Sequence, residues 1–129
     1  AFREMSERCA GLAWEKDGIC IRVAERPSEL VQEGNVLHHC VGGYSKSHAQ
    51  GKIILFIRHS RRPDRSWYTL NIDVRTKAEI QLHGYGNEFA DGKKLQINKK
   101  VLAFVSDWRR EVLDKWTLPQ KPKKKAKAG

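Results

Sequence analysis

The spacing of hydrophobic residues predicts helices in the first part of the chain, with one short strand among them. Apolar residues recur at helical spacing near the start, which predicts a helix over residues 2–14. Strict alternation over residues 19–24 predicts a short strand. Ser28 is a favourable helix start and Gly34 a favourable stop, so a short helix is expected between them.

The next segment, residues 36–50, has two interpretations. Asn35 can cap a single helix that runs to Gln50. The adjacent Gly42 and Gly43 weaken such a helix by about 1 kcal/mol each relative to alanine. The alternative is a loop followed by a helix that starts near Ser45. Both interpretations stay open from the sequence.

Strand patterns follow, and a helical pattern closes the chain. Residues 52–58 are apolar on both faces, as expected of a central covered strand. Residues 67–74 alternate, and a tight connection leads into residues 78–83, which predicts an antiparallel hairpin. A last helix is expected from Lys94 or Asn98 to Trp116. Its apolar stripe is Val101, Val105, Trp108, Val112 and Trp116, widened by Leu102 and Leu113.

These elements predict an α+β fold: N-terminal helices, an antiparallel sheet of three to four strands, and a C-terminal helix covering the sheet. A chain of 129 residues with 40% hydrophobic and 31% charged residues suits one domain. We expect that domain at residues 1–118 and a disordered basic tail at 119–129. The start at Ala1 rather than at a methionine indicates a fragment or a processed chain.

The chain shows no sign of a membrane span or a secretory signal. The longest uncharged apolar run, Ile53 to Ile57, is far too short to cross a bilayer, and the N-terminus has no continuous apolar stretch. Three scattered cysteines are typical of reduced thiols. We therefore expect a cytoplasmic protein without a membrane partner.

Positive charge is concentrated in a few segments. The chain has 25 Lys and Arg against 15 Asp and Glu, a formal net charge of +10. Such charge favours polyanions, most plausibly RNA or DNA, although a basic surface can also be merely solvating. The expected nucleic-acid contacts are Arg61, Arg62, Arg65, Lys121, Lys123, Lys124, Lys125 and Lys127.

Candidate chemistry concentrates in residues 38–44, which hold two histidines, a cysteine and a tyrosine. Adjacent histidines point about 100° apart on a helix, and no CxxC or HxxxH pair exists, so neither a metal nor a cofactor is predicted. Cys40 as a nucleophile, acid–base chemistry on a phosphodiester, and a purely structural cluster remain as alternatives. We expect Cys40 to be mostly buried and inert.

A polar strand face extends this candidate site. Alternation places Gln81 and His83 on the strand face opposite Leu82, away from the core. We expect the candidate catalytic residues to converge on one concave polar site. They are His38, His39, Tyr44, Arg58 and Gln81.

The central motif Leu37-His38-His39-Cys40-Val41-Gly42-Gly43-Tyr44 resembles the PcfJ-like proteins, which include accessory proteins of conjugative plasmids and occur in mobile elements and phages. The resemblance runs from about Gly18 to Trp108 and is to the carboxy-terminal part of longer family members. It implies a mobile-element context and a shared site at residues 38–44, but no reaction. The chain departs from the family pattern at residues 83–87, where relatives carry a basic residue and then asparagines, so no role is carried over to His83.

Three functions follow as hypotheses. The first is a nucleic-acid-associated accessory module of a mobile genetic element. The second is a small metal-independent nuclease or another enzyme that uses residues 38–44. The third is an adaptor that binds a protein partner in a mobile-element complex. A pocket at the candidate catalytic residues favours the enzyme, a basic face with exposed Trp67 or Tyr85 favours binding, and an exposed apolar patch favours the adaptor.

Overall fold

A five-stranded antiparallel sheet forms the centre of the computed structural model, which describes residues 1–37, 44–84, 89–90, 93–94 and 96–121. Each strand pairs with the next one along the chain, so the sheet is a meander. Its strands are β1 (Trp14–Lys16), β2 (Ile19–Val23), β3 (Lys52–His59), β4 (Tyr68–Asp73) and β5 (Glu79–His83). A separate two-stranded ribbon pairs β6 (Phe89–Ala90) with β7 (Lys93–Lys94).

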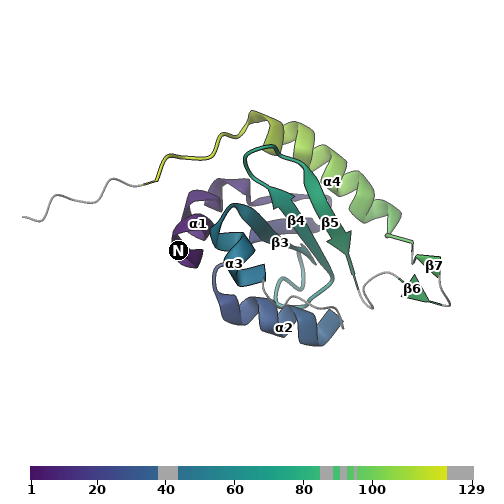
Figure 1. Cartoon of the computed structure of the whole chain (residues 1–129). Helices are drawn as coiled ribbons and strands as arrows, with labels where there is room; N and C mark the ends of the chain where they lie inside the picture. Colours follow the sequence, from purple (N-terminus) through teal and green to yellow (C-terminus); the bar gives the residue numbers. More distant parts are fainter. Residues whose placement is uncertain (38–43, 85–88, 91–92, 95, 122–129) are drawn as a thin grey trace, which may run out of the picture.

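Helices cover both faces of the sheet (Figure 1). α4 (Lys99–Glu111) packs on one face. α2 (Pro27–Leu37) and α3 (Tyr44–Ala49) belong to the other face and connect β2 to β3. α1 (Phe2–Arg8) contributes to both cores. The predicted α+β class is confirmed. Among the described residues, no helix is long and apolar enough to span a membrane.

The larger core lies between the sheet and α4. Trp108 is completely buried, and its indole N–H donates to the carbonyl of Leu12 at 2.9 Å, which ties α4 to the N-terminal segment. Asn98 caps the helix by accepting the N–H of Lys100 at 2.8 Å. Val101, Val105 and Trp108 of the predicted stripe are buried on α4, but Leu102 is exposed. The helix ends at Glu111, short of the predicted Trp116, so Val112 and Trp116 lie beyond it and are half-buried.

The smaller core lies beneath α2 and α3 and contains a buried histidine. Nδ1 of His48 accepts the N–H of Ile54 at 3.0 Å, so the ring proton belongs on Nε2, which lies 2.8 Å from the hydroxyl of Ser6. That hydroxyl donates to the carbonyl of Ala24. Burial lowers the pKa of His48 to about 4, so the ring is neutral at physiological pH. Three segments distant in sequence are joined by this chain of hydrogen bonds.

The sheet has one strand more than the sequence predicted. The helix expected over residues 2–14 ends at Arg8, and β1 pairs with β2 across Asp17 and Gly18. Both turn residues have positive φ, 52° and 81°, as a two-residue hairpin requires. The Asp-Gly pair therefore closes a hairpin, and the hairpin supplies the additional strand.

The structure corrects one predicted helix end in the middle of the chain. α2 continues past Gly34 to Leu37, so the predicted stop at Gly34 is wrong. α3 covers Tyr44–Ala49, and the choice between a single helix and a loop followed by a helix stays open because it depends on the residues before Tyr44. Residues 38–43 lie outside the described part of the chain. The covered strand and the hairpin of β4 and β5 occur where they were predicted, within two residues.

Candidate functional site

Polar side chains line the sheet face that α2 and α3 cover. Thr69 and Asn71 on β4 lie opposite His83 and Gln81 on β5. Arg58 follows on β3, where alternation places it on the same face as Phe56, the partner of Thr69. The candidate residues Arg58 and Gln81 therefore share a sheet face. For Gln81 this is the face opposite Leu82, as alternation predicted.

Arg58 is bound to a carboxylate from α2. Its two terminal nitrogens donate to Glu33 at 3.0 and 2.7 Å. The same carboxylate accepts hydroxyl hydrogen bonds from Ser66 at 2.6 Å and Thr69 at 2.7 Å. The side chains of Arg58 and Glu33 are only 7% and 1% exposed. This fork-to-fork pair fastens α2 to the sheet, and it occupies the Arg58 nitrogens that a phosphate would otherwise use.

Tyr44 and Gln81 meet at the other side of this polar face. The Tyr44 hydroxyl donates to Oε1 of Gln81 at 3.1 Å, and both side chains are half-buried. The contact brings together two of the five candidate catalytic residues. His38, His39 and Cys40 lie outside the described residues. Convergence of all five candidates therefore stays a prediction.

Sequence reasoning missed Glu33 as a member of this cluster. Glu33 lies three residues after Leu30 on α2, so the two side chains share a helix face, and both are buried. An acid on the apolar face of a helix was the available signal for a buried ion pair.

Outside this cluster, burial raises the pKa of the Cys9 thiol to about 11, which keeps it protonated and inert. Within the described residues, no group of three or more His, Cys, Asp or Glu side chains could hold a metal ion.

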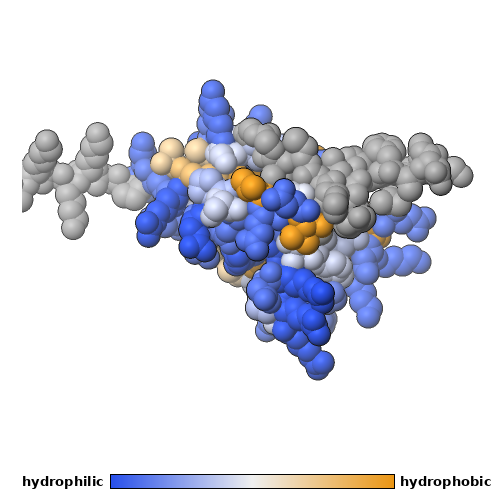
Figure 2. Space-filling view, turned by 90° about the horizontal axis from the view of Figure 1, so that it is seen from below, coloured by the Kyte–Doolittle hydropathy of each residue, from blue (hydrophilic) through white to orange (hydrophobic). Residues whose placement is uncertain are grey.

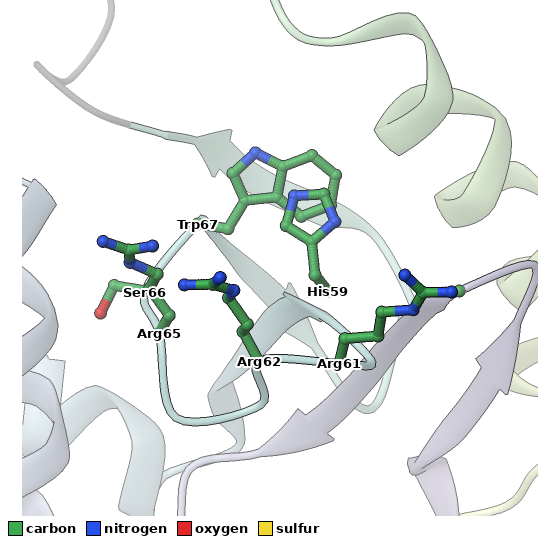
Figure 3. Close-up of a pocket in the computed structure, with 7 residues that line it drawn as sticks. His59, Arg61, Arg62, Arg65, Ser66 and Trp67 are labelled. Atoms are coloured by element: carbon green, nitrogen blue, oxygen red, sulfur yellow. The ribbon is translucent and has the colours of Figure 1, made fainter.

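A second site lies at the loop between β3 and β4. An open cleft of about 690 Å³ is bordered by this loop and by the turn between β1 and β2 (Figure 3). Its lining combines aromatic rings with guanidinium groups. The lining residues are Gly18, His59, Arg61, Arg62, Arg65, Ser66 and Trp67.

Two stacked rings form the wall of this cleft. The His59 ring lies on the Trp67 indole with centroids 3.7 Å apart and planes 21° apart. Trp67 is half-buried and meets Tyr68 edge-on at 5.5 Å, whereas His59 is exposed. A second cavity of about 530 Å³ borders the same two rings and is lined by Lys99 and Lys100 at the start of α4. Sequence reasoning selected Trp67 but missed the stacking of His59 on it.

The arginines of the loop are exposed, and none of them forms an ion pair with a described residue. Arg61, Arg62 and Arg65 make no ion pair within the described part of the chain. Their backbone is nevertheless ordered by turns. The N–H of Arg62 donates to the carbonyl of His59 at 2.9 Å, and the N–H of Arg65 donates to that of Arg62 at 3.0 Å. The loop therefore presents three free guanidinium groups on a hydrogen-bonded base.

The expected lysine contacts are placed less completely. Lys121 is exposed and lies 4.0 Å from Glu4 on α1. It does not line the cleft. The remaining predicted contacts, Lys123, Lys124, Lys125 and Lys127, lie outside the described residues. Of the predicted nucleic-acid contacts, the structure brings together the three arginines.

Comparison with known proteins identifies relatives of this chain. A sequence profile described as PcfJ-like protein matches residues 2–97. An uncharacterized protein, Lin1253/Lin1744 of Listeria innocua serovar 6a (strain ATCC BAA-680 / CLIP 11262), is 34% identical over 89 residues, 67% of this chain and 19% of that relative. The chain thus spans about a fifth of that relative's length. No solved structure matches it. Because the profile covers well over half of the sequence, the chain belongs to the PcfJ-like protein family.

Proposed function

We propose that this domain binds RNA or DNA through the cleft beside the β3–β4 loop, as an accessory module of a mobile genetic element. The observation that carries the proposal is the set of three exposed arginines without acidic partners among the described residues, around an aromatic-walled cleft. The mobile-element setting rests on the resemblance to PcfJ-like proteins, and the proposed compartment is the cytoplasm.

The chemistry of the arginines selects the ligand. A guanidinium is permanently charged, and its planar fork matches the oxygens of a phosphate. Each phosphate that an arginine neutralises releases condensed counterions, which makes binding favourable at low salt. Arg58 and Arg22 form ion pairs with Glu33 and Glu29, whereas the loop arginines form no ion pair with a described residue. A polyanion would supply the negatively charged partners that these arginines do not find in the described part of the chain.

The two other hypotheses have different support. The contact between Tyr44 and Gln81, beside the buried Asn71, favours an enzyme at the covered sheet face as the second candidate function. An adaptor surface has less support, since the exposed large apolar side chains Val31, Val36, Ile80 and Leu102 are distributed over three elements. The face on the α2 side is mostly hydrophilic, with small separate hydrophobic areas (Figure 2).

A charge-matched pair of triple variants tests the proposal. Arg61→Ala/Arg62→Ala/Arg65→Ala removes the cleft cations. Arg3→Ala/Lys46→Ala/Lys115→Ala removes the same charge from three exposed positions that do not line the cleft. Fluorescence anisotropy with labelled RNA and DNA measures affinity against salt concentration.

The cleft variant is expected to bind more weakly than the control. Its slope of log K against log salt should become shallower by about 0.7 for each single-strand phosphate that an arginine no longer neutralises, or by about 0.9 on duplex DNA. Equal affinities and slopes for the two variants would contradict the proposal. The same incubations, analysed on denaturing gels, test cleavage. Cleavage that Tyr44→Phe or Gln81→Ala abolishes would support the enzyme instead.

A further inference from the structure

We propose that the cleft is selective for single-stranded nucleic acid, with one base stacked on the exposed face of His59. This inference rests on the proposed function and names the form of the ligand. The base would extend the existing stack of Trp67 and His59 by one ring. The chemistry is shared by RNA and DNA, since every base presents an aromatic face.

The geometry of the two rings leaves one stacking surface open. Trp67 covers one face of the His59 ring at a centroid distance of 3.7 Å. His59 is nevertheless exposed, and it lines the cleft together with the three arginines. Its accessible surface is therefore the opposite face and the ring edges. Figure 3 shows the ring lying across the indole, with Arg61 and Arg62 extending from the same loop.

The core and Tyr68 support Trp67, the inner ring of the stack. Trp67 packs against the larger core and meets the ring of Tyr68 edge-on. The hydroxyl of Tyr68 accepts the N–H of Asn98 at 3.0 Å, which links this aromatic cluster to the start of α4. Because these contacts place Trp67 before a ligand arrives, stacking requires less ordering of side chains, and more of the interaction energy appears as affinity.

Cations line both cavities that border the stack. Arg61, Arg62 and Arg65 line the cleft, and Lys99 and Lys100 line the second cavity that borders the same two rings. A strand whose base rests on His59 therefore has cations near it in both cavities. Duplex bases are already stacked on their neighbours and expose only their edges in the grooves. Away from a duplex end, only an unpaired base can offer its face to this platform.

Two substitutions of His59 separate stacking from packing. His59→Leu keeps an apolar cover on Trp67 but removes the aromatic face. His59→Phe keeps the face and serves as the matched control. The probes are labelled single strands of about 12 nucleotides, oligouridylate and oligodeoxythymidylate, and a DNA duplex of the same length. His59→Leu should weaken single-strand binding by about 5- to 150-fold, with little effect on the duplex, and His59→Phe should retain most of it.

A second measurement needs no variant at all. The unaltered protein is titrated with oligodeoxythymidylate and with an abasic strand of equal length and charge. The abasic strand should bind more weakly by a factor in the same range. Oligouridylate and oligodeoxythymidylate show whether RNA or DNA is preferred.

The outcomes separate this inference from the proposed function. Suppose that the loop-arginine variant binds weakly. If the abasic strand then binds as tightly as oligodeoxythymidylate, or His59→Leu binds single strands as tightly as the unaltered protein, stacking is overturned and nucleic-acid binding stands. Duplex binding as tight as single-strand binding likewise overturns the inference alone. If the loop-arginine variant and its charge-matched control bind alike, the proposed function fails, and the inference fails with it.

Discussion

Arginines that lie only a few positions apart in sequence behave in opposite ways. On the sheet face beneath α2 and α3, Arg58 is buried against Glu33. In the loop that follows, Arg61, Arg62 and Arg65 are exposed without acidic partners among the described residues. The difference teaches that an arginine stabilises the fold where the fold supplies its counter-charge, and is available to a ligand where the fold does not.

The largest expected effect is on the buried side of this comparison. Glu33→Ala leaves Arg58 buried without its counter-charge and should reduce the free energy of unfolding by about 3–5 kcal/mol. Urea denaturation measures this change. The matched control is Glu7→Ala, which removes an exposed carboxylate paired with Arg3. If Glu33→Ala lowered the free energy of unfolding by less than about 1 kcal/mol, the comparison would fail, because the ion pair of Arg58 and Glu33 would then contribute little to stability.

The next effect uses pH to probe the same region. The folded pKa of His48 is about 4, against 6.5 for the free side chain. Between these values the unfolded chain binds more protons, so stability is lost as pH falls through this window. The His48 contribution amounts to about 3 kcal/mol between about pH 7 and about pH 4. In His48→Gln this part of the pH dependence should vanish, as denaturation at several pH values would show. An unchanged profile would mean that another group is responsible.

A smaller effect is expected where the two regions are joined. A Cβ at Gly84 would lie 2.9 Å from the ring of Tyr68. Gly84→Ala should therefore displace that ring and cost about 1–3 kcal/mol. It should also weaken single-strand binding, because Tyr68 supports Trp67 and the start of α4. Gly18→Ala is the contrasting variant: it faces open space, so its cost comes from backbone strain at φ 81° alone. Unchanged binding by Gly84→Ala would show that the platform does not need Tyr68.

The smallest effect on stability belongs to the loop. Arg62→Ala should change the free energy of unfolding by no more than about 0.5 kcal/mol, because the side chain is exposed and makes no ion pair with the described residues. It should still weaken nucleic-acid binding measurably. Thermal unfolding measures the stability of this variant, and fluorescence anisotropy on the same preparation measures its affinity for nucleic acid. A strongly destabilised Arg62→Ala would remove the contrast with Arg58.

The sequence predicted the sheet better than the site. Strict alternation located β4 and β5, and an unbroken apolar run located β3, because these patterns are local. β1 was missed because Asp17-Gly18 fits a helix end as well as a hairpin turn. The partner of Arg58 could not be predicted, since Glu33 lies 25 residues earlier and meets it only through tertiary packing. The stacking of His59 on Trp67 likewise depends on how the loop closes.

The position of α4 has a consequence for where this domain can be cut. The family match ends at residue 97, yet Val101, Phe104, Val105 and Trp108 cover one face of the sheet. A chain truncated after residue 97 keeps all five strands but exposes that apolar face to water. A PcfJ-like relative with the same sheet therefore needs residues beyond the matched region, or a partner protein, to cover this apolar face. The structural boundary of the domain lies beyond the boundary of the recognisable sequence.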